Sequence, residues 1–403
     1  MNTNNHIINR IYYIEKIKPF IDKSLIKVLV GQRRVGKSYI LLQLIEYVKT
    51  VRKDFNIIYI NKEDIKFSFI KTGIELHDYI QSQRIVNKIN YIFIDEIQDI
   101  QAFEVALRSL LLDSQNDIYI TGSNAQLLSS DLSGFLSGRY IEFNIHSLSY
   151  LEFLQFHNKE NNDLNFEQYL KFGGLPYLIH LPLEEHIVYD YIKSVYNTIL
   201  YRDIVNRYAI RNTLFLENLS IFLAQQIGNL FSAKSISDFL KSQQINMPSN
   251  LVQLYASYFS NSCLVNKAER YDVQGKRKFE IREKYYFEDL GIRNVIAGYS
   301  IAEQAKLLEN IVYNHLIYKG YTVKVGVLGD KEIDFVAQKN NETKYFQVAL
   351  QLTDEKTTQR EFGNLLAIKD NYPKYVISKE IFSGNSFQGI EHWNIKDFLL
   401  KFE

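Results

Sequence analysis

The 403-residue sequence is poor in several features, and each shortage excludes a class of protein or site. It contains one cysteine, Cys263, which excludes a disulfide framework and a cysteine-based metal site. No apolar run approaches the roughly 18 residues that a membrane-spanning helix needs. The first ten residues, MNTNNHIINR, do not have the pattern of a signal peptide. We therefore expect a cytoplasmic protein without a membrane partner.

The sequence also has little net charge and few chain-breaking residues. Its 47 basic and 46 acidic residues give a net charge of +1, so any nucleic-acid binding must come from a local patch. Only 5 prolines and 18 glycines are present, and we find no low-complexity tract or internal repeat, so linkers are hard to locate. The length accommodates roughly two to four domains with cores of their own.

A phosphate-binding loop is encoded in IKVLVGQRRVGKSYILLQLI, residues 26–45, between an apolar strand pattern and an apolar helix pattern. Glycines at both ends of the loop let the backbone bend around an anion, so that N–H groups and the helix N-terminus face phosphate oxygens. Lys37 is expected to reach the β- and γ-phosphates of ATP, and the Ser38 hydroxyl to bind Mg²⁺. The predicted ATP-binding residues are Gly31, Gln32, Arg33, Arg34, Val35, Gly36, Lys37, Ser38, Tyr39 and, from the next motif, Asp95.

A second motif, YIFIDEIQDI at residues 91–100, predicts a buried parallel strand that ends in two carboxylates. The carboxyl ends of such strands are where α/β sheets bind ligands. Asp95 is expected to hold Mg²⁺ through its water shell, and Glu96 to polarise the water that attacks the γ-phosphate. Adjacent residues on a strand face opposite ways, so a salt-bridged strand end is the alternative interpretation.

The N-terminal half has the alternating pattern of an α/β fold with a doubly wound parallel sheet. Strands are expected at residues 26–30, 56–60, 91–95, 117–121 and 140–144, with helical patterns between most of them. Ser123 and Asn124 follow the fourth strand and would lie beside the γ-phosphate if that strand neighbours the one that bears Asp95. Arg139 precedes the fifth strand, and the residues alone leave open whether it is an ordinary surface arginine.

Four segments together resemble a prokaryotic AAA-type P-loop ATPase family whose members carry a C-terminal domain of formerly unknown function. They are GQRRVGKS, IFIDEIQDI, ITGSNAQLLSSDLSGFLSGRY and FGGLPYLI, and the resemblance spans nearly the whole chain. The resemblance implies a sensor role for Ser123 or Asn124. It also implies that Arg139 is an arginine finger that reaches a neighbouring subunit of a homo-oligomer. A helical lid would open at the glycines and proline of the last segment, Gly173, Gly174 and Pro176.

The middle of the C-terminal half has the pattern of a winged helix. Apolar positions recur at helical spacing in three segments, and Ser232 and Ser249 are placed to cap the second and third helices. Strands are expected near residues 264–270 and 284–287. In a winged helix the third helix enters a DNA groove, and the link between the strands would contact phosphates through Lys276, Arg277 and Lys278. A charged hairpin turn kept polar for solubility is the equally weighted alternative.

The last part of the chain resembles a restriction-endonuclease-like fold. Glu309 on an amphipathic helix, Asp334 on one strand and Gln347 on the next fall where such folds place their metal ligands. Metal-dependent hydrolysis usually also needs a lysine two residues after the last ligand to activate water, and Ala349 occupies that position. We therefore predict a nuclease-like fold that has lost cleavage.

Four domains and three functions follow as expectations. The domains are an ATPase core at 1–150, a helical lid at 151–205, a winged helix at 206–288 and a nuclease-like domain at 289–403. The first function is an ATPase, with ATP and Mg²⁺ as cofactors, that couples hydrolysis to action on DNA. The alternative is a nucleotide-gated scaffold that binds a protein partner, and an active ATP-dependent nuclease is a weaker third.

Overall fold

The computed structural model describes residues 8–123, 134, 136, 138–275, 277–352, 355–380 and 386–403, with the backbone alone for 277–281 and 355–357. Contacts divide the chain into two compact units. The first unit comprises Met1–His146 and Asn261–Cys263, and the second comprises Ser147–Ser260 and Leu264–Glu403. No helix in the described ranges is long and apolar enough to cross a bilayer.

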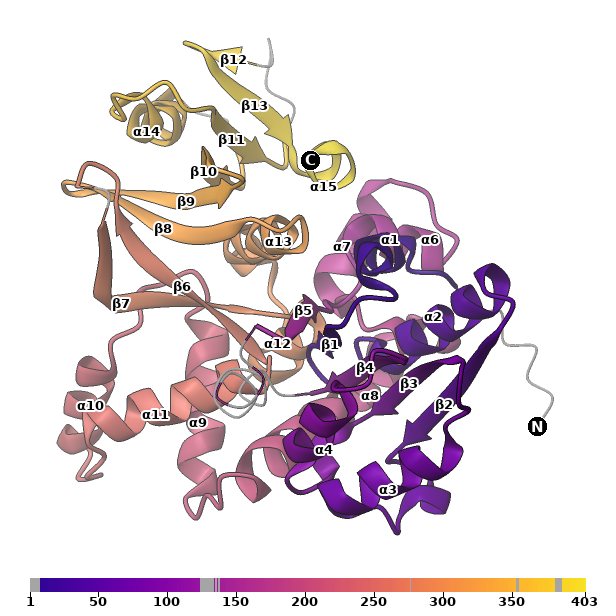
Figure 1. The fold of residues 1–403 in the computed structure, drawn as a ribbon. Coiled ribbons are helices and arrows are strands. Elements are labelled where there is room, and N and C mark those ends of the chain that lie inside the picture. Colours follow the sequence, from indigo (N-terminus) through magenta and orange to yellow (C-terminus); the bar gives the residue numbers. More distant parts are fainter. Residues whose placement is uncertain are drawn as a thin grey trace. The chain divides into compact units, whose positions relative to one another are not determined.

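The first unit is built on a five-stranded parallel sheet with the strand order β2-β3-β4-β1-β5. The strands are β1 Ile26–Val30, β2 Phe55–Asn61, β3 Ile89–Asp95, β4 Asn116–Gly122 and β5 Tyr140–Asn144. The α-helices described in full are α1 Ile11–Ile17, α2 Lys37–Val51, α3 Gly73–Gln83 and α4 Phe103–Leu110, drawn in indigo and purple in Figure 1. All five predicted strands are confirmed to within two residues.

Burial explains why the central strands read as continuous apolar runs. Every residue of β1 and β4 is buried, as are the last six residues of β3. Isoleucines and valines of these strands form one core with apolar residues of α3 and α4. Helices therefore cover the sheet, as the alternating pattern predicts. Since β4 lies between β1 and β3, its carboxyl end lies between the phosphate-binding loop and Asp95.

A buried ion pair joins β1 to β4 within this sheet. The Lys27 ammonium bonds to the Asp117 carboxylate, and both side chains are almost completely buried. Burial lowers the pKa of Lys27 and raises that of Asp117, because each charge has lost its water. Tyr119 donates a further hydrogen bond to Asp117 at 2.8 Å. Protein groups therefore replace water as the hydrogen-bond partners of the Asp117 carboxylate.

Breaking this pair is expected to destabilise the fold. Asp117→Asn leaves the Lys27 ammonium buried without its counter-charge, which should reduce the free energy of unfolding by about 3–5 kcal/mol. Urea unfolding of both proteins measures the difference. The control is Glu46→Gln, which breaks the exposed Lys49–Glu46 pair and should cost less than about 1 kcal/mol. Equal effects of the two substitutions would contradict the assignment.

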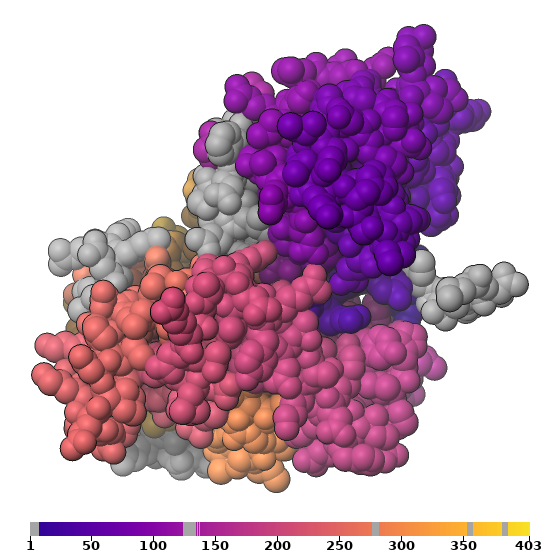
Figure 2. Space-filling model, turned by 90° about the horizontal axis from the view of Figure 1, so that it is seen from below, coloured from indigo at the N-terminus to yellow at the C-terminus, as the bar shows by residue number. Residues whose placement is uncertain are grey.

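The second unit begins with helices and continues into a sheet (Figure 1). The helical elements are α6 Tyr150–Phe156, α7 Asp163–Phe172, η5 Pro176–His180, α8 Glu185–Thr198, the π-helix η6 Ile199–Asn206, α9 Thr213–Gln225, α10 Ala233–Ser242 and α11 Ser249–Asn261. In the space-filling view, much of this helical part forms one continuous surface (Figure 2). Ser232 caps α10 as predicted, by accepting the Ser235 N–H. Ser249 is instead the first residue of α11, so the helix begins one residue earlier than a cap at Ser249 would require.

The sheet of the second unit has eight strands in the order β12-β13-β11-β10-β9-β8-β6-β7. The strands are β6 Val265–Asp272, β7 Arg277–Phe287, β8 Thr322–Leu328, β9 Lys331–Lys339, β10 Glu342–Ala349, β11 Lys374–Ser378, β12 Ser386–Phe387 and β13 Ile390–Asn394. Its helices are α12 Leu290–Ala297, α13 Gln304–Tyr318, α14 Glu355–Leu366 and α15 Ile395–Lys401. Because β6 pairs in parallel with β8, the hairpin that we assigned to a winged helix is continuous with the sheet that we assigned to a nuclease-like domain.

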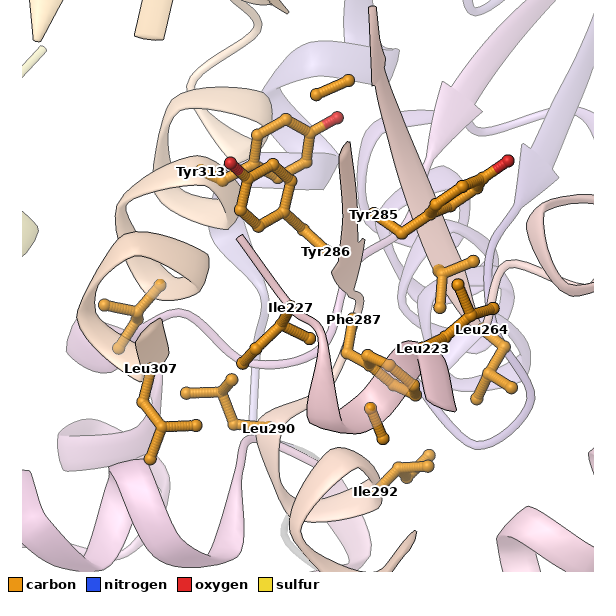
Figure 3. Close-up of a cluster of buried hydrophobic side chains, with 14 of the residues drawn as sticks. Leu223, Ile227, Leu264, Tyr285, Tyr286, Phe287, Leu290, Ile292, Leu307 and Tyr313 are labelled. Carbon is orange, nitrogen blue, oxygen red and sulfur yellow. The ribbon is translucent and has the colours of Figure 1, made fainter. Parts of the chain in front are cut away.

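One hydrophobic core joins the helices and the sheet of this unit. Figure 3 shows side chains of α9, α12 and α13 packed around the end of β7, with the Tyr286 and Tyr313 rings stacked at 4.3 Å between centroids. The boundary that we predicted at residue 288 therefore lies inside a shared core. The four-domain division remains a prediction.

The bend after α7 is fixed to the start of α12. Gly173 has φ +74, and a Cβ atom there would lie 2.3 Å from Asp289 Oδ1, so this close approach requires glycine. The Gly174 N–H donates to Asp289 Oδ2 at 2.8 Å, and the Ile292 N–H donates to Oδ1 at 3.1 Å. Burial raises the pKa of Asp289 to about 6. The segment predicted to open a lid is thus bonded to Asp289 within the second unit.

Candidate nucleotide-binding site

The loop between β1 and α2 has the backbone that phosphate binding requires. Gly36 has φ +95 and Arg34 has φ +70, which turn the chain sharply before α2. A Cβ atom on Gly31 would lie 2.1 Å from the Ile145 carbonyl oxygen, so only glycine fits there. The loop therefore ends at the N-terminus of α2, whose free N–H groups face an anion.

Lys37 lies at the centre of this loop. Its Nζ donates to the carbonyl oxygens of Gly31 and Gln32, both at 2.9 Å, and the side chain is buried. Burial lowers the pKa of Lys37, and the Glu96 carboxylate partly offsets that effect. Phosphate oxygens would give the ammonium a stronger partner than carbonyl groups do, since charge-assisted hydrogen bonds are about twice as strong as neutral ones.

Asp95 is held at the end of β3 by two hydroxyl groups. Thr121 on β4 donates to Asp95 Oδ1 at 2.5 Å, and Ser38 also donates to this carboxylate. Burial raises the pKa of Asp95, and the two hydroxyl groups counteract that increase. Ser38 and Asp95 are oxygen ligands of the kind that Mg²⁺ prefers, and they are in contact. These two residues fit the predicted magnesium site.

Glu96 follows Asp95 in a left-handed backbone conformation, with φ +57. This conformation turns the chain out of the strand, so the two carboxylates need not face opposite ways. The Glu96 N–H donates to Thr121 Oγ1 at 2.9 Å, and Gln98 donates a hydrogen bond to Glu96 Oε2. Thr121 therefore fixes both acidic residues. Our sequence analysis did not single out Thr121 or Gln98, although both lie within quoted motifs.

Arg10 supports the loop from outside the motif and was also missed. Its Nη1 donates to the Val35 carbonyl oxygen at 3.0 Å and to the His146 carbonyl oxygen at 2.9 Å. The side chain is buried and its guanidinium lies over the Tyr13 ring at 4.6 Å. An isolated arginine before an apolar helix carries no sequence signal for this contact.

The remaining predicted residues differ in exposure. Gln32 and Arg33 are buried, whereas Arg34 and Tyr39 are exposed. The Arg33 guanidinium lies 3.8 Å from Glu63. Ser123 is buried at the end of β4, the strand adjacent to β3 as the sensor prediction requires. Asn124 lies outside the described residues.

Arg139 lies at the opposite end of the sheet from the phosphate-binding loop. Its carbonyl oxygen accepts the Ile26 N–H at 2.9 Å, at the amino end of β1, and its side chain is exposed. The loop follows Val30 at the carboxyl end of β1, four residues beyond Ile26, which is a distance of roughly 13 Å at about 3.3 Å per residue. The fold therefore separates Arg139 from the loop of its own chain.

Two family models match parts of the chain, which together end at residue 302. Residues 23–154 match an AAA domain, and residues 163–302 match a domain of unknown function (DUF8612). An uncharacterized protein of Haemophilus influenzae is 35% identical over 98% of this chain and 99% of its own length. An uncharacterized protein of Methanocaldococcus jannaschii is 30% identical over 86% of this chain and 79% of its own length.

Solved structures with partial similarity include a Cdc6p protein from Pyrobaculum aerophilum, with a TM-score of 0.33 and 11% identity over 73% of this chain and 95% of that one. The DnaA replication initiator bound to AMPPCP and single-stranded DNA has a TM-score of 0.32 and 15% identity, over 64% of this chain and 90% of that one. The matched AAA domain and the geometry of the loop define a nucleotide-binding P-loop fold.

Proposed function

Because the chain belongs to the family that includes the Haemophilus influenzae and Methanocaldococcus jannaschii proteins and contains an AAA domain, we propose that it is a Mg²⁺-dependent ATPase. The observation that carries this proposal is the convergence of Lys37, Ser38, Asp95 and Glu96, with the Thr121 hydroxyl bonded to both acidic residues. Bound Mg²⁺ would neutralise charge that develops on the phosphates.

Each residue of the site then has a distinct role. The loop N–H groups and Lys37 bind and orient the phosphates, and Ser38 and Asp95 hold the metal. Glu96 accepts a proton from the attacking water, and Gln98 orients its carboxylate. Ser123 or Asn124 takes the sensor role that the sequence predicts. The test is ATP hydrolysis by the purified protein, measured with and without duplex and single-stranded DNA.

Arg139 is proposed to complete the site of a neighbouring copy in a homo-oligomer, since it lies far from its own loop. Mixing Arg139→Ala with Lys37→Ala, each inactive alone, should restore part of the hydrolysis rate. An arginine finger supplies on the order of 10³-fold in rate. Arg108→Ala, which removes an exposed arginine of α4, is the control and should stay active alone. Full activity of an Arg139→Ala monomer at every concentration would contradict this role.

We propose DNA as the target of the ATPase, on the basis of three helices followed by the β6–β7 hairpin with a basic tip. Lys276 lies outside the described residues, and for Arg277 and Lys278 the structure describes only the backbone. Replacing all three by Ala should weaken DNA binding and reduce the salt slope by up to about three. Replacing Lys49, Lys53 and Lys66 of the first unit removes the same charge and should leave the slope unchanged. Salt-insensitive binding would contradict the proposal.

A protein partner is the second candidate target, and one observation favours it. The sequence of α11, SNLVQLYASYFSN, has no charged residue, so this helix would bring no arginine or lysine to DNA phosphates. Three apolar side chains are exposed in this region: Phe239 on α10, Ile245 just after α10, and Leu254 on α11. Hydrolysis that is insensitive to DNA but saturates with a purified protein would establish this alternative.

A further inference from the structure

The second unit contains a buried charged cluster that the ATPase proposal does not use. The three residues predicted as metal ligands do come together. The Asp334 N–H donates to Gln347 Oε1 at 3.4 Å, and the Val348 N–H donates to Asp334 Oδ2 at 2.7 Å. Asp334 is buried, and burial together with the Glu309 carboxylate raises its pKa. Glu309 on α13 is thus close enough to act on Asp334 on β9.

A lysine from a fourth element enters this cluster. Lys284 on β7 has a side chain that is only 3% exposed. Its Nζ lies 3.1 Å from Glu309 Oε1 and 2.7 Å from Glu332 Oε1. The Tyr286 hydroxyl donates to the same Glu309 oxygen at 2.6 Å. The ammonium is therefore held between carboxylates of α13 and β9.

Electrostatics keep this lysine charged. Burial alone would lower the pKa of Lys284, but the carboxylates of Glu309, Asp334 and Glu332 outweigh burial and raise it. The cluster thus stabilises a cation whose own side chain is almost completely buried. A buried cation with two carboxylate partners is the charge arrangement that oxygen-ligated divalent metals also require.

The position of Lys284 differs from the lysine position of an active nuclease-like site. In our sequence analysis that position is Ala349, at the end of β10, and it is buried without an amine. Lys284 instead bonds directly to the helix glutamate. The far side of that glutamate is closed, since a Cβ atom on Gly228 would lie 2.8 Å from Glu309 Oε2. No group of three His, Cys, Asp or Glu side chains is arranged to hold a metal within the described ranges.

We propose that the Lys284 ammonium occupies the cation position of this cluster, so that an internal charge replaces a divalent metal between Glu309, Glu332 and Asp334. The cluster is then a latent metal site whose built-in cation stabilises the junction of α13, β7 and β9. This inference is independent of the ATPase proposal, because every residue involved belongs to the second unit.

The test is to remove the amine and measure Mn²⁺ binding. In nucleotide-free, full-length protein, Lys284→Met should gain one Mn²⁺ site per chain, at least tenfold tighter than any Mn²⁺ binding by the parent at this cluster. The amount of bound Mn²⁺ is measured from the loss of the free Mn²⁺ signal in electron paramagnetic resonance. Adding Glu309→Gln to this variant should remove the new site. Lys267→Met, on β6, should gain none. Mn²⁺ bound at the ATP site is common to all variants and cancels in the comparison.

Three results would overturn the proposal. The first is Mn²⁺ binding by the parent protein that Glu309→Gln abolishes, because the cluster would then already be a working metal site. The second is a folded Lys284→Met variant that gains no site. If Lys284→Met does not fold alone, Mn²⁺ should restore a cooperative thermal unfolding transition that is missing in metal-free buffer, because a ligand of the folded state stabilises it. Absence of that rescue is the third.

Discussion

Lys37→Ala is expected to abolish nucleotide-dependent behaviour. The substitution removes a buried ammonium that is positioned for the β- and γ-phosphates and leaves only the loop N–H groups to bind them. A hydrogen bond to a charged group contributes about 1.5–3 kcal/mol, so ATP affinity should fall on the order of 10²-fold. Equilibrium titration with a fluorescent ATP analogue measures the loss.

Lys49→Ala is the matched control for this change. Lys49 lies on the same helix, α2, but is exposed and pairs only with Glu46 among the described ion pairs. ATP affinity of Lys49→Ala should equal that of the parent protein. If Lys37→Ala bound ATP as tightly as Lys49→Ala, the loop would not be the phosphate site.

Glu96→Gln is expected to separate binding from hydrolysis. Glutamine preserves the shape of the side chain and can still bond to Gln98, but it cannot accept a proton from water. Affinity for ATP should therefore change little, while turnover should fall by about 10²–10⁴-fold. Titration of ATP and phosphate release, measured on the same preparation, give the two quantities.

The control for Glu96→Gln is Glu104→Gln on α4, which removes a carboxylate near in sequence but outside the site. That variant should hydrolyse ATP at the parental rate. Parental turnover by Glu96→Gln would show that another group activates the water. Loss of both binding and hydrolysis would instead indicate that Glu96 is needed to maintain the loop.

The sheet of the first unit was predictable because local patterns determine it. Buried parallel strands are continuous apolar runs, and the glycine positions of the loop follow from backbone conformation. The Thr121 contacts were not predictable, because they depend on the register between β3 and β4. The contact of Arg10 with His146 joins residues 136 positions apart, and no local pattern encodes such a distance.

The second unit was predicted less completely for a related reason. Its helices and the β6–β7 hairpin have clear local patterns, and Glu309, Asp334 and Gln347 were correctly grouped. The pairing of β6 with β8 is non-local, however. The sequence therefore suggested a domain boundary between strands that belong to one sheet. Lys284 was missed because it lies 50 positions before Asp334 in the sequence. Only the path of β7 in the folded protein brings it into the cluster.

Phosphate release from ATP by the purified full-length protein, measured with Mg²⁺ and with excess EDTA, is the decisive experiment for the ATPase. We expect turnover that requires Mg²⁺, rises with protein concentration more steeply than linearly, and is lost in both Lys37→Ala and Glu96→Gln. Turnover that persists in EDTA or in either variant would contradict the assigned site. Absence of hydrolysis at every protein concentration, with or without DNA, would contradict the ATPase itself.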